Sequence, residues 1–362
     1  MKVHVPKKYL ADSLSHVERI IPSRASNPSL SLLRLDLSEK YLTLSGSNMD
    51  IDIQARLSAD TESEGSFSLP ASVFSQVIKS LPGDLVELGF SDTELDITSG
   101  SFGTKLQLAS SSSVSPLEFP DAYEGSLDAG HFAKALAHVR YAAAVAEYQA
   151  IFRGVKIEFS DTKTRTVATD GFRLAYYNLP IASGVIGEIV IPARSVDELT
   201  KLLSDGDTQI SLANNQLSIK NGAYKANIKL MEGNFPDYER IIPSHFPVSI
   251  TLDAGVLAEA VSRVAVMADK TANNRVDLFI KEGQLQITAE GSYGRSQEAM
   301  EVMQEGDDPE IALAYNAKYL VDALVPIEGE IKLSFSGTTS PSVGISEKDP
   351  NYLAMVVPLR TG

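Results

Sequence analysis

The sequence predicts an α+β fold built from three repeated domains, and three observations lead to this prediction. Two helical patterns each recur three times along the 362 residues, at steps of 122 to 125 positions. Stretches of alternating apolar and polar residues lie between them, as is typical of strands with one buried face. The period is too long for a solenoid, whose units run roughly 20 to 50 residues, so each copy has the size of a domain.

The first helical pattern places apolar residues three and four positions apart, so that they share one face of a helix. Asp128 and Asp253 precede two of the copies and are expected to cap them, whereas Pro6 lies at the start of the other. The predicted buried residues are Leu10, Leu14 and Val17, then Phe132, Leu136 and Val139, then Leu257, Val261 and Val264.

Alternating segments follow at residues 30–57, 153–179 and 275–302, and predict strands. The second helical pattern begins at Ala71, Ala193 and Ala317, and further strand-like segments follow it. The order helix, strands, helix, strands predicts two helices on one face of an antiparallel sheet in each repeat. The repeat boundaries predict domains at 1–120, 121–245 and 246–362.

Composition narrows the classes of function. The chain contains no cysteine, which excludes disulfides, thiolate nucleophiles and cysteine-based zinc sites. No segment resembles a signal peptide, and no apolar run reaches the roughly 18 residues that a membrane span needs. We therefore expect a soluble cytoplasmic protein. The net charge of −15 argues against general nucleic-acid binding, although the distribution of the charges decides this point.

Motifs for catalysis and metal binding are weak in this sequence. The five histidines fit no HExxH or other metal-ligand spacing, and there is no GxSxG, Walker A, GxGxxG or EF-hand pattern. The acidic segment 305–310 lacks alternating ligand spacing and is interpreted as a solvated loop. We therefore predict no metal and no cofactor.

The segment 168–175, with the sequence ATDGFRLA, is the most unusual one in the chain. Asp-Gly between two strand-like runs is typical of a hairpin turn. Only the second repeat combines this turn with a Phe and an Arg. The segment is therefore either a plain turn or the place where one repeat is specialised for a partner. A different interpretation is a hydrolase or transferase that uses Asp170 and Arg173.

Five motifs together carry a resemblance to a known family over essentially the whole length. They are Glu18 to Arg24 (ERIIPSR), Phe152 to Val155 (FRGV), the ATDGFRLA segment, Gly233 to Tyr238 (GNFPDY), and Val356 to Arg360 (VVPLR). With these motifs and its threefold repeat, the chain resembles the bacterial DNA sliding clamp, the beta subunit of the replicative DNA polymerase.

The resemblance implies a head-to-tail homodimeric ring that encircles double-stranded DNA and has no catalytic activity. Such a ring tethers the polymerase catalytic subunit, the clamp loader and repair polymerases through clamp-binding peptides. Helix spacing agrees with a dimer. Six helices packed about 10 Å apart would enclose a hole of only about 9 Å, whereas twelve would enclose about 28 Å. A duplex is roughly 20 Å across.

The resemblance also assigns residues. Arg24 matches a family DNA contact, and Tyr148 and Gln149 fall in a family DNA-binding loop, although their positions are shifted from the family pattern. Because a clamp must slide, we expect acidic residues outside and a mild basic bias on the inner helices. The candidates on or near helices, each of which could equally be a plain surface charge, are Lys7, Arg19, Lys79, Lys134, Arg140, Arg194, Lys201 and Arg263.

The family binds partner peptides in an apolar pocket between the second and third domains. The matching residues here are Phe152, Thr169, Gly171, Phe172, Arg173, Leu174, Pro236, Arg240, Ile241, Tyr319, Ser342, Met355, Val357, Pro358, Leu359 and Arg360. The two arginines at 173 and 240 could take carboxylates or carbonyls. Phe172 stands where the family often has His, and the chain continues two residues past Arg360. Leu174, Val357 and Pro358 could also be ordinary core.

Dimer contacts in the family join apolar residues of domain one to a helix end of domain three. That points to Leu106 and Leu108 against Val266 and Met267, all of which could instead be intramolecular core. A third interpretation of the whole chain is a structural repeat protein that binds only proteins.

Overall fold

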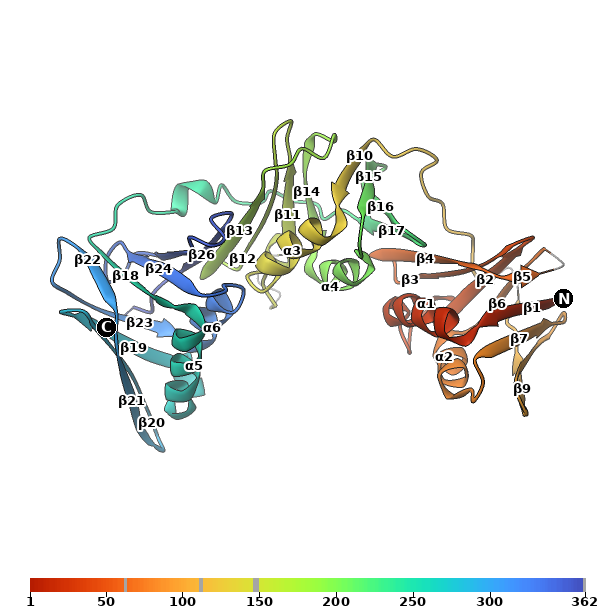
Figure 1. The fold of residues 1–362 in the computed structure, drawn as a ribbon, viewed down its shortest axis with the longest axis horizontal. Coiled ribbons are helices and arrows are strands. Elements are labelled where there is room, and N and C mark those ends of the chain that lie inside the picture. The colour runs from red at the N-terminus through yellow and green to blue at the C-terminus, as the bar shows by residue number, and fades with distance from the viewer. Residues whose placement is uncertain (62–63, 111–112, 146–149, 361–362) are drawn as a thin grey trace. The chain divides into compact units, whose positions relative to one another are not determined.

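Helices and strands alternate along the chain much as the repeat predicts. The computed structural model describes residues 1–61, 64–110, 113–145 and 150–360. Within these ranges lie six α-helices, two in each repeat (Figure 1). They are α1 (Lys7–Ile20), α2 (Ala71–Ser80), α3 (Ala129–Arg140), α4 (Ala193–Leu202), α5 (Ala254–Val264) and α6 (Ala317–Leu324). Short 3-10 helices are η1 (Pro28–Ser31), η3 (Ala150–Arg153), η4 (Glu239–Ile241), η5 (Ala265–Met267) and η6 (Lys270–Ala272).

The helix starts follow the predicted capping residues. The Asp253 carboxylate accepts a hydrogen bond from the Val256 amide at 2.9 Å, and Asp128 accepts one from the His131 amide at 2.8 Å. Pro6 precedes α1 and supplies no side-chain cap. Capping satisfies amides that have no partner inside the helix. All nine residues predicted to form the buried helix faces are buried.

Contacts divide the chain into two compact units rather than three. Unit one comprises Met1–Ala133, Ala182–Ile186 and Arg194–Leu230, and unit two comprises Lys134–Ile181, Gly187–Ala193 and Met231–Gly362. The second repeat contributes to both, because its strands pair with those of both neighbouring repeats. The boundaries 1–120, 121–245 and 246–362 stay a prediction from the sequence period.

Unit one contains a five-stranded and an eight-stranded antiparallel sheet. The first has the order β5 (Asp60–Thr61), β1 (Lys2–Pro6), β7 (Leu85–Phe90), β8 (Glu94–Ser99), β9 (Phe102–Gln107). The second has the order β10 (Gly125–Asp128), β15 (Asp207–Ala213), β16 (Gln216–Asn221), β17 (Tyr224–Lys229), β4 (Ile51–Ser58), β3 (Tyr41–Ser47), β2 (Leu32–Ser38), β6 (Gly65–Pro70). The first and second repeats join where β17 pairs with β4, with Ala226 opposite Ile53.

Unit two contains a nine-stranded and a four-stranded antiparallel sheet. The first has the order β14 (Gly187–Pro192), β11 (Gly154–Phe159), β12 (Thr164–Thr169), β13 (Arg173–Leu179), β26 (Tyr352–Val356), β25 (Ser342–Ile345), β24 (Glu330–Phe335), β18 (Val248–Asp253), β22 (Met303–Gly306). The second has the order β21 (Gly294–Glu301), β20 (Gln284–Gly291), β19 (Arg275–Lys281), β23 (Glu310–Asn316). The second and third repeats join where β13 pairs with β26.

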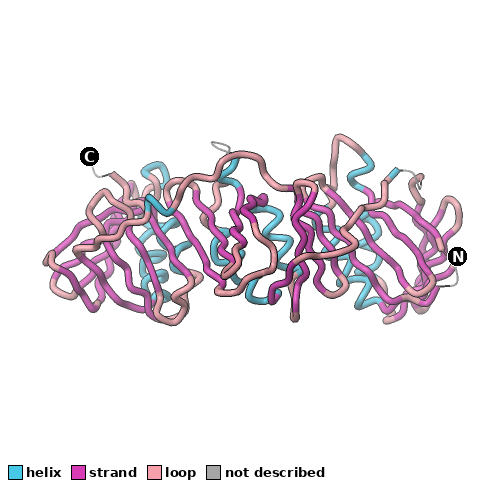
Figure 2. The backbone as a smooth tube through the Cα atoms, turned by 90° about the horizontal axis from the view of Figure 1, so that it is seen from above, coloured by secondary structure: helices cyan, strands magenta, loops and turns pink. Residues whose placement is uncertain are grey.

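Strands are the commonest elements in both units, and the helices are short segments packed against them (Figure 2). In unit one, α1 packs on β3, β4 and α2, and in unit two, α5 packs on β20 and α6. Helices on antiparallel sheet agree with the α+β prediction. The sequence period did not reveal that neighbouring repeats share a sheet. Each of the four sheets is open, so the described part of the chain has eight edge strands: β5, β9, β10, β6, β14, β22, β21 and β23. Of these, β9 and β21 are the repeat equivalents of the strands that join neighbouring repeats.

Candidate functional site

The turn between β12 and β13 is held by its own side chains. The Asp170 carboxylate accepts hydrogen bonds from the amides of Phe172 and Arg173, both at 3.0 Å. Gly171 lies at a φ of 88°, a conformation that glycine adopts without steric cost. The Thr169 hydroxyl donates to the Arg173 carbonyl at 2.7 Å. This arrangement leaves the Phe172 ring 61% exposed, so the Asp-Gly signal is a turn that presents an aromatic side chain.

An open cavity of about 740 Å³ lies beside this turn, within unit two. The Phe172 ring stacks with the ring of Tyr319 on α6, with centroids 6.3 Å apart. The volume falls in the range of known ligand pockets, roughly 300–1,000 Å³. The lining residues are Ala144, Val145, Phe152, Asp170, Gly171, Phe172, Arg173, Asn274, Asn316, Lys318 and Tyr319. We call this cavity the Phe172 pocket.

Arg173 is buried in the wall of the Phe172 pocket and is paired inside the protein. Its Nε lies 3.0 Å from Asp170 and its Nη1 lies 2.5 Å from Asp322 on α6. The guanidinium also sits 4.5 Å from the centre of the Tyr319 ring. Burial raises the pKa of the Tyr319 phenol, and the Asp170 carboxylate raises it further. Only 5% of the Arg173 side chain is exposed, which leaves little of it for a ligand.

Five of the predicted peptide-pocket residues line the Phe172 pocket: Phe152, Gly171, Phe172, Arg173 and Tyr319. Thr169 is buried beneath the turn. The tail after β26 runs along the same structure, because the Val357 amide donates to the Phe172 carbonyl and the Leu359 amide donates to the Ala314 carbonyl. Pro358 is buried and Arg360 is exposed.

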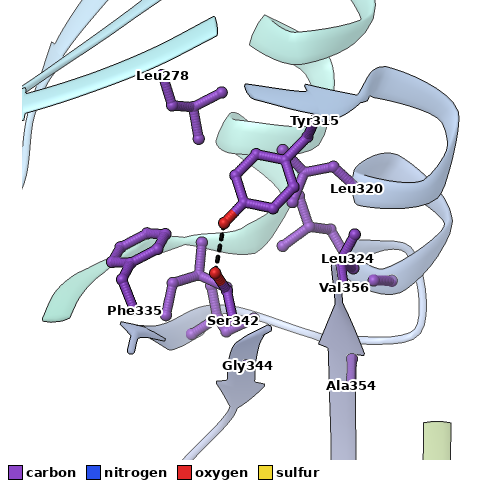
Figure 3. A pocket seen from close by; sticks show the side chains of 12 residues that line it. Leu278, Tyr315, Leu320, Leu324, Phe335, Ser342, Gly344, Ala354 and Val356 are labelled. Atoms are coloured by element: carbon purple, nitrogen blue, oxygen red, sulfur yellow. Dashed lines mark hydrogen bonds between the residues drawn. The ribbon is translucent and has the colours of Figure 1, made fainter. Parts of the chain in front are cut away.

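Other predicted pocket residues belong to the core. Leu174 and Met355 pack in a buried cluster with Val167, Tyr238, Val343 and Leu353. Ser342 lines a different, nearly filled hollow of about 20 Å³, where its hydroxyl is hydrogen-bonded to Tyr315 (Figure 3). These three side chains are buried, and their expected role in lining the peptide pocket stays a prediction.

Segment 236–241 contributes none of the residues that line the Phe172 pocket. Pro236 lines a polar cavity of about 470 Å³ together with Lys156, Glu158 and Glu188. The Arg240 side chain is 85% exposed and pairs with Asp237 at 2.7 Å. Ile241 is exposed. Arg240 and Ile241 are therefore surface residues here, and Pro236 belongs to a separate hollow.

Six residues of the pocket were not predicted: Ala144, Val145, Asp170, Asn274, Asn316 and Lys318. Asn316 and Lys318 had a usable signal, because Asn316 caps α6 by accepting from the Lys318 amide at 3.0 Å. An Asn directly before the second helical pattern is typical of an N-cap, so the sequence could have placed Asn316 and Lys318 at the start of α6, next to Tyr319. The positions of Val145 and Asn274 depend on loops and carry no such signal.

The helices are more basic than the rest of the chain. The sequences of α1 to α6 contain ten Lys and Arg against six Asp and Glu, a formal charge of +4. The net charge of the whole chain is −15, so the remainder of the chain carries −19. This distribution follows the predicted basic bias on the helices.

Most of the candidate cations on the helices are paired with carboxylates. Lys79 pairs with Glu18, Lys201 and Arg19 with Glu198, Lys134 with Asp349, and Arg263 with Glu259 and Glu298. Lys7 donates to the Leu81 carbonyl, and Arg140 donates to the Ala193 carbonyl. Arg24 and Arg194 are exposed, and neither forms an ion pair with any other described residue. Tyr148 and Gln149 lie outside the described residues.

The predicted dimer residues lie at the surface or near it. Leu106 and Leu108 are half-buried, on and just after the unpaired edge strand β9. Val266 is exposed and Met267 is half-buried, both in η5. Among the described residues no group of three acidic, His or Cys side chains could hold a metal ion, and no helix is long and apolar enough to cross a membrane.

Comparison with known proteins matches the whole chain. Three family models match in order: the N-terminal domain of the DNA polymerase III beta subunit at residues 1–120, its central domain at 126–237 and its C-terminal domain at 239–360. The beta sliding clamp of Caulobacter vibrioides is 28% identical over 99% of this chain and 100% of its own length.

Solved structures agree with the sequence comparison. The DNA polymerase sliding clamp of Bacillus subtilis matches with a TM-score of 0.94 at 25% identity, over 100% of both chains. A beta sliding clamp from C. crescentus matches with a TM-score of 0.91 at 26% identity, also over 100% of both chains. That structure holds polyethylene glycol at a putative beta-motif tethering region.

Proposed function

The chain belongs to the family of bacterial DNA polymerase III beta subunits, the sliding clamps that tether the polymerase for processivity, and from this premise we propose how its own residues serve that function. Two copies form a head-to-tail ring that encircles double-stranded DNA. The ring carries partners on the Phe172 pocket and performs no chemistry itself. The domains of each copy are 1–120, 121–245 and 246–362.

The unpaired strand edges are the observation that carries the ring proposal. Inside the chain, β17 of the second repeat pairs with β4 of the first, and β26 of the third pairs with β13 of the second. The equivalent strands left over are β9 of the first repeat and β21 of the third. An exposed edge is a template for pairing with another chain. Pairing β9 of one copy with β21 of the next, in both directions, closes a dimer.

The charge distribution supports a ring whose helices face the DNA. The helices are formally +4 while the rest of the chain is −19. Ion pairs neutralise most of the helix cations, so the attraction to phosphate is weak. A weak, sequence-independent attraction suits a protein that slides. Arg24 and Arg194, which form no ion pair with described residues, are the proposed DNA contacts.

The Phe172 pocket is the proposed site for clamp-binding peptides of the polymerase, the clamp loader and repair polymerases. Its stacked aromatic walls would take the apolar side chains of an extended peptide that contains Gln, Leu and Phe. The alternative, a hydrolase or transferase that uses Asp170 and Arg173, finds no support in the geometry. Both side chains are paired with each other, and Arg173 is also paired with Asp322.

Retention on DNA of different topology tests the proposal. The protein is loaded onto nicked circular plasmid by a clamp loader, half of the sample is cut once by a restriction enzyme, and the DNA-bound protein is measured after gel filtration. We expect retention on the circle and rapid loss from the linear form. Blocking both ends of the linear DNA with bound streptavidin should restore retention. Equal loss from circular and linear DNA contradicts a topological link and leaves a protein-binding repeat protein instead.

A further inference from the structure

The Phe172 pocket has two cations in its lining, and their environments differ. Arg173 is 5% exposed, whereas the Lys318 side chain is 67% exposed. Both lie against the same oxygen of Asp322, with Arg173 at 2.5 Å and Lys318 at 2.8 Å. The resemblance to the clamp family pointed to Arg173 as a ligand contact. The difference in exposure suggests that the two cations have different roles in ligand binding.

Arg173 joins two parts of the pocket that come from different repeats. Its Nε holds Asp170, which fixes the turn that presents Phe172. Its Nη1 holds Asp322 on α6, and its guanidinium covers the Tyr319 ring at 4.5 Å. Holding two carboxylates at once through two nitrogens of one planar guanidinium suits arginine and not lysine. A buried charge that satisfies two carboxylates is costly to redirect, so Arg173 stays with them when a ligand binds.

Lys318 has the opposite character. Its ammonium shares one carboxylate oxygen with Arg173, and an ion pair this exposed contributes little to stability, so breaking it costs little. The long stem can move the charge over the open cavity. Of the other polar groups of the lining, Asn274 and Asn316 are neutral, and the Asp170 carboxylate is 11% exposed and paired with Arg173. Lys318 is therefore the one exposed cation among the described residues that line this pocket.

We propose that Lys318 makes the pocket prefer a peptide with a carboxylate beside its apolar residues. Arg173 is a positioning residue that keeps Phe172 and Tyr319 in place. The proposal rests on the peptide-binding function of the pocket. It assigns the specificity of that pocket to a residue that the sequence motifs did not single out.

The test uses the full-length protein and two fluorescent peptides, Gln-Leu-Asp-Leu-Phe-amide and Gln-Leu-Asn-Leu-Phe-amide, with binding followed by anisotropy. The native protein should bind the Asp peptide about three- to fivefold more tightly at low salt, and added salt should remove the preference. In Lys318→Met the two peptides should bind equally, with the Asn peptide unchanged. In Arg173→Lys, which keeps the charge and loses the planar fork, both peptides should weaken by the same factor, about tenfold or more.

The matched control is Lys332→Met, which removes an exposed cation outside the cavity and should change neither peptide. Melting curves identify any variant that does not fold, and Asp322→Asn then replaces Arg173→Lys as the variant that loosens the positioning contacts. A preference for Asp that survives Lys318→Met, or an Arg173→Lys variant that weakens only the Asp peptide, overturns the inference. Native protein that binds both peptides equally also overturns it. Native protein that binds neither peptide overturns the proposed peptide function, and the inference with it.

Discussion

The two strand junctions inside the chain have the same backbone and different side chains. In the first repeat, Asn48 accepts hydrogen bonds from the amides of Asp50 and Ile51 at 3.0 Å, as Asp170 does from the equivalent amides in the second repeat. Met49 has a φ of 77° where Gly171 has 88°. The next repeat then closes each turn in the same way, since the Lys229 amide donates to Asp50 and the Val357 amide donates to Phe172.

The hollows beside these turns nevertheless differ. At the first junction a polar hollow of about 240 Å³ is lined by Asp50, Asp52, Asn227 and Lys229 among others. At the second, the larger Phe172 pocket has aromatic walls. Hydrogen bonds between main-chain atoms reproduce the scaffold whatever the side chains are. One turn scaffold is therefore present at both junctions, and only the second carries an aromatic pocket.

The largest predicted effect concerns the junction that only a second copy can complete. The Leu108 amide donates to Thr93, so by the alternation of an antiparallel strand the Lys105 amide points away from β8. Lys105→Pro removes that amide and should abolish the dimer, leaving particles of 39.0 kDa in light scattering after gel filtration. Lys105→Ala keeps the amide and should remain a dimer. A dimer that persists in the proline variant argues against β9 pairing.

The next effect tests the contrast between the two turns. Phe172→Ala removes one wall of the aromatic pair and should weaken a Gln-Leu-Phe type peptide about ten- to hundredfold, measured by calorimetry. Met49→Ala removes the exposed apolar side chain of the equivalent turn and should leave peptide binding unchanged. Equal losses in the two variants would show that the junctions are not specialised.

A smaller effect is expected in the linkers between repeats, which share a Phe-Pro-Asp pattern followed by Tyr123 or Tyr238. The Tyr238 hydroxyl accepts from Arg165 and donates to Glu158, both at 2.9 Å. Tyr238→Phe should cost about 1–3 kcal/mol in chemical denaturation. The buried Tyr123 hydroxyl has no hydrogen-bond partner among the described residues, so Tyr123→Phe should be neutral or slightly stabilising. A comparable loss in both variants would contradict this assignment.

The smallest effect is a pH dependence common to both junctions. His16 and His138 stand one repeat apart, and each ring meets a tyrosine of the next repeat edge-on, Tyr224 or Tyr352. Burial lowers the pKa of both histidines, helped by the nearby charges of Arg19 and Lys134 respectively. The folded state then binds fewer protons than the unfolded state, so stability present above about pH 6.5 is lost as the pH falls below it.

Melting temperatures between pH 8 and pH 5 measure this dependence. His16→Gln and His138→Gln should each flatten the curve by a similar amount, since neither amide titrates. A steeper fall at low pH in either variant would reverse the expected sign.

Sequence periodicity by itself determined the local elements of this protein. Leu10, Leu14 and Val17 and their equivalents are buried, and helices begin at Ala71, Ala193 and Ala317. These features depend on neighbours within a few positions, where side-chain spacing and capping decide the conformation. The same local logic identified the turn at Asp170 and Gly171. The expected positive charge on the helices came instead from the family resemblance.

Only the tertiary structure decided which strands become neighbours and which side chains the pocket exposes. Strand pairing across repeats joins residues more than a hundred positions apart, and a period of 122 to 125 residues carries no information about it. For the same reason the sequence did not show that Leu174 and Met355 are buried in the core. It also did not show that Arg173 pairs with both Asp170 and Asp322. Lys318 shares an oxygen of Asp322 with Arg173, and of the two cations only Lys318 is exposed. Such competition for partners depends on three-dimensional proximity, which no single segment encodes.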